Sequence, residues 1–69
     1  MVEIFKTDVS RKSKANTIIF LLQKEFPDLK INFDLKDCDN VLRVEGKSIY
    51  IEKIISLLNQ QNHLCELLQ

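Results

Sequence analysis

The clearest chemical signal in the sequence is a short run of cationic and hydroxyl side chains. Its members are Ser10, Arg11, Lys12, Ser13 and Lys14, and they lie where an apolar periodicity typical of a helix begins. Because a helix N-terminus carries about half a positive charge, cations there are mildly unfavourable unless an anion lies nearby. The same end suits phosphate, carboxylate or an acidic protein surface. The run therefore predicts contact with an anion or an acidic partner, and a solvated loop is the alternative.

A second group combines carboxylate, thiol and imidazole side chains that could ligate a metal ion. Asp37, Cys38 and Asp39 are consecutive, and His63 is the single histidine of the chain. Their spacing matches no established ligand motif, and ordinary turn formation explains a turn rich in Asp and Asn equally well. No nucleophile is accompanied by a base. We therefore expect no catalytic residue, no cofactor and no resident metal, and keep these four residues as alternative ligands.

Six segments alternate between the periodicities of strands and helices. Short alternating or β-branched runs predict strands, and apolar residues three and four apart predict helices. In chain order we expect a strand over Val2–Thr7, a helix over Ser10–Glu25, strands over Leu29–Leu35 and Val41–Val44, a helix from Ile51 to near Gln61, and a strand over His63–Leu68. The third strand could extend toward Ile49, and the last segment could instead continue the second helix.

Local signals mark the ends of both predicted helices. Ser10 or Ser13 is the predicted N-cap of the first helix, because a hydroxyl accepts from the exposed backbone N–H groups. Pro27 ends that helix, since the residue before a proline avoids the helical region. Asn62 suits the left-handed conformation that closes a helix. That break favours the final strand, with Cys65 on its buried face.

The element order βαββαβ predicts an α+β fold. Each helix has one apolar stripe and the strands have one apolar face, so these surfaces must be buried against each other. The simplest arrangement is a ferredoxin-like two-layer sandwich, with antiparallel strands in the order 4-1-3-2 and both helices on one face. The 69 residues fit a single domain over residues 1–69. This topology brings the loop after the first strand, the central hairpin and the loop before the last strand to one end.

The two cysteines are not expected to pair. Cys38 lies at the predicted hairpin tip and Cys65 in an edge strand, too far apart for disulfide geometry. Cys65 is interpreted as a small core residue. No targeting signal is visible in Met1–Lys6, and no stretch approaches the roughly 20 apolar residues of a membrane span. We expect a small soluble cytoplasmic protein with reduced thiols.

The charges of the chain cancel but are unevenly placed. There are 10 Lys and Arg against 10 Asp and Glu, with six against four in residues 1–30 and four against six in residues 31–69. Zero net charge argues against a nucleic-acid binder, which needs surplus cations. An RNA-recognition domain also needs aromatic side chains on the open sheet face, where Phe5 is the one candidate. The basic run and the Asp34–Asp39 hairpin either pair internally or form a dipolar docking surface.

The chain resembles the heavy-metal-associated domain of copper chaperones and metal-transporting ATPases over nearly its whole length. The matching features are two apolar helix anchors, Ile18 and Leu22, the turn Pro27-Asp28-Leu29, and Asn62-His63 at the place of a Gly followed by an aromatic residue. The resemblance implies the scaffold of that family.

The metal-binding motif of that family is not matched. Its loop between the first strand and the first helix carries a Met and, after a gap, Cys-x-x-Cys, whose thiolates bind soft cations such as Cu(I). Here Val9 stands at the Met position, and Arg11 and Lys14 stand at the two Cys positions. Fixed cations repel a metal ion, so the resemblance implies the scaffold without its usual activity.

Taken together, the sequence predicts a non-catalytic binding module that contacts an unknown protein or a small anionic ligand through residues 10–14. Nucleic acid and membrane are not expected partners. One alternative is a metal chaperone or sensor with ligands from Cys38, Cys65, His63 and the Asp cluster. The other is an oligomeric regulatory ligand-binding domain, built as a weak homodimer through a sheet edge.

Overall fold

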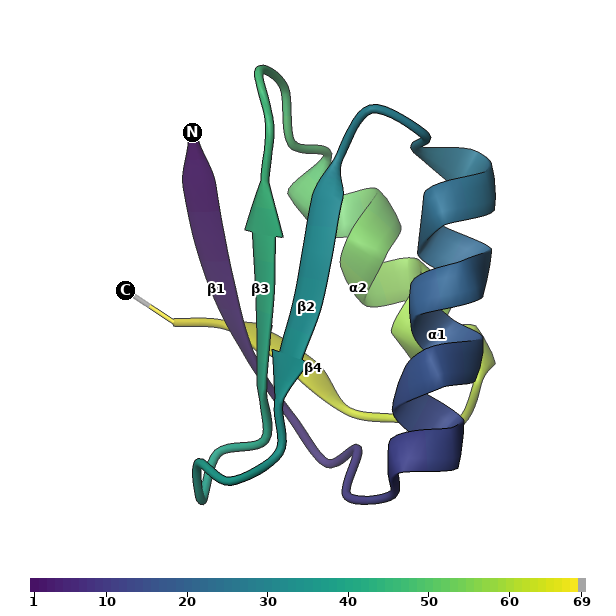
Figure 1. Cartoon of the computed structure of the whole chain (residues 1–69), viewed down its shortest axis with the longest axis vertical. Helices are drawn as coiled ribbons and strands as arrows, with labels where there is room; N and C mark the ends of the chain where they lie inside the picture. The colour runs from purple at the N-terminus through teal and green to yellow at the C-terminus, as the bar shows by residue number, and fades with distance from the viewer. Residues whose placement is uncertain (69) are drawn as a thin grey trace.

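A computed structural model describes residues 1–68 and confirms the predicted α+β ferredoxin-like layout (Figure 1). The elements are β1 (Val2–Thr7), α1 (Lys12–Glu25), β2 (Lys30–Asp34), β3 (Val41–Glu45), α2 (Ile51–Gln60) and β4 (Cys65–Leu67). Gln69, the last residue of the predicted domain, lies outside the described residues. Neither α1 nor α2 is long and apolar enough to cross a bilayer.

The four strands form one antiparallel sheet in the order β2-β3-β1-β4, as the sequence predicts. The pairing aligns one apolar row across the whole sheet, in which Phe33 faces Leu42, Leu42 faces Phe5, and Phe5 faces Leu67. Side chains in such a row point to the same side of a sheet. The row therefore forms the sheet's contribution to the core.

Both helices cover the face of the sheet that carries this row (Figure 1). Helix α1 buries Ala15, Ile18 and Leu22, and α2 buries Ile54 and Leu58. These positions recur at spacings of three and four, so each helix presents one apolar stripe to the sheet. Burial of these stripes is the main stabilising contribution to the fold.

The backbone conformation of Asn62 ends α2 as predicted. Asn62 has a left-handed φ of 67°. Its N–H donates to the Asn59 carbonyl and the His63 N–H donates to the Leu58 carbonyl, each at 3.0 Å. These two bonds form the Schellman motif, which turns the chain out of the helix. The residues that follow pair with β1 as strand β4, so the alternative of a continued helix is wrong.

Candidate functional site

The basic segment, residues 10–14, connects β1 to the first turn of α1, and all of its residues are exposed. The residue before it, Val9, is fully buried, and its N–H donates to Thr7 Oγ1 at 3.2 Å. This anchor keeps the chain extended through Arg11, which has φ −101° and ψ 135°. The helix therefore begins only at Lys12.

The predicted serine cap of α1 is wrong. Arg11 occupies the N-cap position, and its carbonyl accepts the first helical bond from the Ala15 N–H at 2.9 Å. Ser10 precedes the cap, and Ser13 lies inside the first turn, where its carbonyl accepts from the Thr17 hydroxyl. No side chain accepts from the N-terminal N–H groups of α1 within residues 1–68. Those donors remain available to an external acceptor.

The positive charge of the basic segment is not neutralised by the neighbouring loops. The ion pairs within residues 1–68 join Lys6 to Asp39, Arg43 to Glu45 and His63 to Asp8. None of them includes Arg11, Lys12 or Lys14, and the first turn of α1 holds no acidic residue. Within the described residues, the basic segment and the Asp34–Asp39 hairpin therefore do not form ion pairs with each other. The helix N-terminus adds its own partial positive charge there.

The three loops that were expected to meet at one end of the fold do so. The Thr7 N–H donates to the Asp39 carbonyl at 3.0 Å, and the Thr7 hydroxyl donates to the Asn40 carbonyl at 2.6 Å. On the other side, the Leu64 N–H donates to Asp8 Oδ1 at 3.0 Å. The loop between β1 and α1 is therefore held between the β2–β3 turn and the α2–β4 loop.

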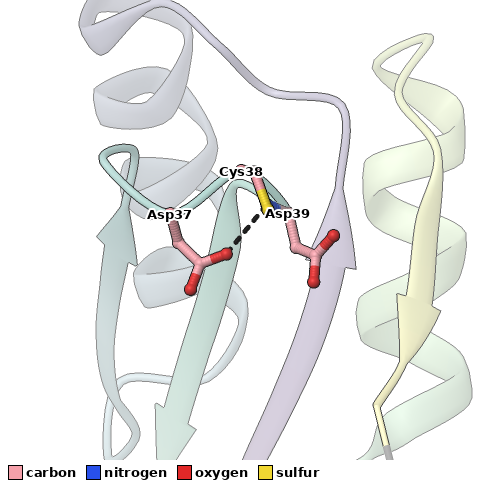
Figure 2. A group of neighbouring side chains, drawn as sticks. All are labelled: Asp37, Cys38 and Asp39. Carbon is pink, nitrogen blue, oxygen red and sulfur yellow. Dashed lines mark hydrogen bonds between the residues drawn. The ribbon is translucent and has the colours of Figure 1, made fainter.

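The candidate metal ligands of the hairpin are consecutive residues of a tight turn (Figure 2). One potential ligand atom each from Asp37, Cys38 and Asp39 lies within 4.8 Å of the others. Asp37 Oδ1, however, accepts from the Asp39 N–H at 2.9 Å, the bond drawn as a dashed line in Figure 2. The Asn40 N–H donates to the Asp37 carbonyl, and Asn40 has a φ of 45°. The acidic side chain of Asp37 thus stabilises the turn.

The four candidate metal ligands do not come together, because His63 lies outside the group formed by Asp37, Cys38 and Asp39. The strand order puts β3 and β4 on opposite sides of β1, so the hairpin and the α2–β4 loop flank the end of β1 from opposite sides. His63 Nδ1 instead lies 2.9 Å from Asp8 Oδ1. The same Asp8 oxygen also accepts from the Leu64 N–H, so Asp8 holds His63 in the α2–β4 loop rather than near the hairpin.

The two cysteines occupy different environments and are both unpaired, as expected. Cys38 is exposed in the turn, whereas Cys65 packs against the core from β4. Burial raises the pKa of the Cys65 thiol from 9.0 to about 12. The side chain is therefore neutral at physiological pH, as a structural thiol should be.

The open face of the sheet does not carry the aromatic residue considered for RNA binding. Phe5 is fully buried beneath the helices, so its assignment to the open face is wrong. In β1 the exposed positions are Val2, Ile4 and Lys6, because the strand alternates with Phe5 and Thr7 directed inward. The open face of β1 therefore offers no ring on which a base could stack.

The surface of residues 1–68 includes a side groove and an end groove, which no local pattern of the sequence predicts. The side groove lies between α1 and β2 and starts at the basic segment; it is lined by Ser10, Lys12, Ala15, Asn16, Ile19, Asn32, Phe33, Asp34, Leu35 and Lys36. The end groove lies at the opposite end, where Phe26 and Tyr50 stack with ring centroids 5.7 Å apart. The spacing of Lys12, Asn16 and Ile19 shows that they share one face of α1. The sequence does not show that this face lies next to β2, because that depends on how α1 packs on the sheet.

Comparisons of the chain with protein-family models, with curated proteins and with solved structures found no match. The function is therefore inferred from the residues and geometry of the chain itself.

Proposed function

We propose that this chain is a non-catalytic interaction module that binds an acidic protein segment through the basic segment. The observation that carries the proposal is the combination of three exposed cations, Arg11, Lys12 and Lys14, with an α1 N-terminus that no described side chain caps. Charge-assisted bonds from such groups to carboxylates are stronger than neutral ones.

The surroundings of the segment support binding rather than catalysis. Its backbone is anchored by buried Val9 and by Thr7, so the cations project from a fixed support. The nearest imidazole, His63, is engaged by a carboxylate and not by a hydroxyl or thiol. In the resemblance to the heavy-metal-associated domain inferred from the sequence alone, Arg11 and Lys14 take the places of the two thiolates. We infer that the loop recognises anions where that family recognises cations.

The proposal is tested by NMR titration of the ¹⁵N-labelled chain with a hexa-aspartate peptide. We expect amide shift changes concentrated in residues 10–14, which diminish with added salt because the contacts are screened. Inorganic phosphate serves as the second probe. If phosphate shifts these amides and the peptide does not, the site is a small-anion site and the proposal is wrong.

Two charge-reversed variants distinguish the effect of the basic segment on binding from the effect of the net charge of the molecule. Replacing Arg11, Lys12 and Lys14 by Glu should weaken peptide binding about tenfold or more, as expected from the loss of three exposed ion pairs. Replacing the exposed Lys24, Lys47 and Lys53 by Glu changes the net charge equally and should weaken binding less. Equal loss in both variants would contradict a localised site.

A further inference from the structure

The side groove continues the basic segment along the edge of the sheet. Helix α1 stands beside β2 (Figure 1), and the groove between them has Ile19, Phe33 and Leu35 as half-buried apolar members. Lys12 and Lys36 line its end nearest the hairpin. Asp34 also lines it, but Oδ1 of Asp34 already accepts from the Lys36 N–H at 3.1 Å. The groove thus combines an apolar floor with a cationic end.

Strand β2 leaves its outer edge open along this groove. Within the described residues 1–68, it is an edge strand that pairs with β3 alone. In an antiparallel pair, alternate residues direct their N–H and C=O groups away from the partner strand, and at an edge these groups can pair with another chain. Gln23 donates to the Leu29 carbonyl at 2.7 Å just before the strand. Within residues 1–68, no side chain bonds the backbone of Lys30–Asp34 itself.

We propose that β2 accepts an extended acidic peptide segment as an additional antiparallel strand, with its apolar side chains in the side groove and its acidic end at Lys12 and the basic segment. This inference rests on the proposed function, and it specifies how the acidic partner is held. Backbone bonds to an edge strand supply affinity in such complexes, and pockets for alternate side chains supply specificity. The cations at the end of the groove attract the acidic residues of the peptide. Because side chains alternate along a strand, every second side chain of the peptide contacts Ile19 and Phe33.

The test uses a synthetic peptide with two N-terminal aspartates followed by alternating valine and threonine. In NMR spectra of the full chain, we expect shift changes in residues 30–36 as well as 10–19. Amides of Lys30–Asp34 should become more protected from hydrogen exchange. N-methylation of the peptide at alternate residues removes the N–H donors along the edge that would face β2. Such a peptide should bind about tenfold more weakly, as expected for two lost backbone bonds.

A blocking variant with a matched control locates the peptide. Asn16→Trp places a bulky uncharged side chain in the side groove, whereas Thr17→Trp places the same side chain on an exposed position outside it. We expect a loss of about tenfold or more in affinity for Asn16→Trp and none for Thr17→Trp. Circular dichroism of both variants checks that α1 is intact.

The outcomes distinguish the two proposals. Shift changes confined to residues 10–14, with no effect of Asn16→Trp or N-methylation, would overturn strand addition while leaving the acidic-partner proposal intact. No response anywhere to the aspartate peptides would overturn both. Concentration-dependent shifts in residues 30–36 without peptide, together with a dimer in light scattering, would mean that a second copy occupies the edge and would also overturn the inference.

Discussion

Thr7 shows how much of the site depends on one small side chain. Its hydroxyl donates to the Asn40 carbonyl and accepts from the Val9 N–H, and the residue is buried. It thereby joins β1, the hairpin and the approach to α1. The basic segment begins immediately after this junction, so its position follows from Thr7 and Val9 rather than from its own exposed side chains.

Replacing Thr7 by Val should destabilise the fold more than its small change in shape suggests. The buried Val9 N–H would lose its acceptor, which costs about 1–3 kcal/mol in the free energy of unfolding. Thr7→Ser keeps the hydroxyl and removes one methyl group, at a cost of about 0.8 kcal/mol. Urea denaturation compares the two. A Ser variant less stable than the Val variant would contradict this account.

Cys65 predicts a pH dependence of stability on the alkaline side. Its thiol pKa is raised to about 12 in the fold, from 9.0. Above pH 9 the unfolded chain therefore loses a proton that the folded chain keeps, so the contribution of Cys65 is complete below pH 9 and is lost as the pH rises toward 12. The stability difference between the wild type and Cys65→Ala should be constant from pH 6 to 8 and decrease above pH 9. A difference independent of pH would contradict a buried neutral thiol.

At the scale of elements, α1 is a helix whose N-terminal end lacks the usual stabilising features. It has cations and no acidic residue in its first turn, and Arg11 supplies no cap. Helix α2 likewise has no side-chain cap at its N-cap residue, Tyr50, but it differs from α1 in having the acidic residue Glu52 in its first turn. The first turn of α1 is therefore a place where a single substitution can add stability.

Arg11→Asp should therefore stabilise the isolated protein and impair binding. An aspartate at this N-cap can accept from the first-turn N–H groups and complements the helix dipole, for a gain of about 1 kcal/mol. In a domain of this size that corresponds to an increase of roughly 4–8 °C in Tm. Arg11→Ala removes the cation without adding an acceptor and serves as control. The idea fails if Arg11→Asp melts below Arg11→Ala, or if it binds hexa-aspartate as tightly as the wild type.

At the scale of the whole molecule, the core is small. The extents are 27 × 24 × 17 Å, and eleven apolar side chains are buried within residues 1–68. A domain of this length has a total stability of a few to about ten kcal/mol. Individual core contacts are therefore a large fraction of the total.

Leu58→Ala tests this dependence. Leu58 is fully buried in α2, and truncation of a buried Leu costs about 2–5 kcal/mol. Phe20→Ala removes a larger apolar side chain that is 67% exposed on α1, and it should change stability by no more than about 0.5 kcal/mol. Thermal unfolding should therefore show a marked loss of Tm for Leu58→Ala alone. Similar effects of the two substitutions would contradict the assigned orientation of the helices.

The sequence alone determined the order of the elements, the apolar stripes of the helices and the location of the basic segment, because these features depend on residues at most a few positions apart. Ile18 and Leu22 define the stripe of α1, and Asn62 ends α2, through local periodicity and backbone preference. The strand order followed because these apolar faces have few ways to be buried together.

Only the tertiary structure decided how these elements meet. Asp8 binds His63 across 55 positions of sequence, and that partner could not be read from either loop. Next to the buried Val9, the N-cap position falls on Arg11, between the two serines that local preference selects as caps. The side groove exists only because Ile19 and Phe33, from separate elements, lie on the same boundary. Such contacts depend on how distant segments of the chain pack together. Local preferences limit the possible arrangements but do not determine which side chains meet.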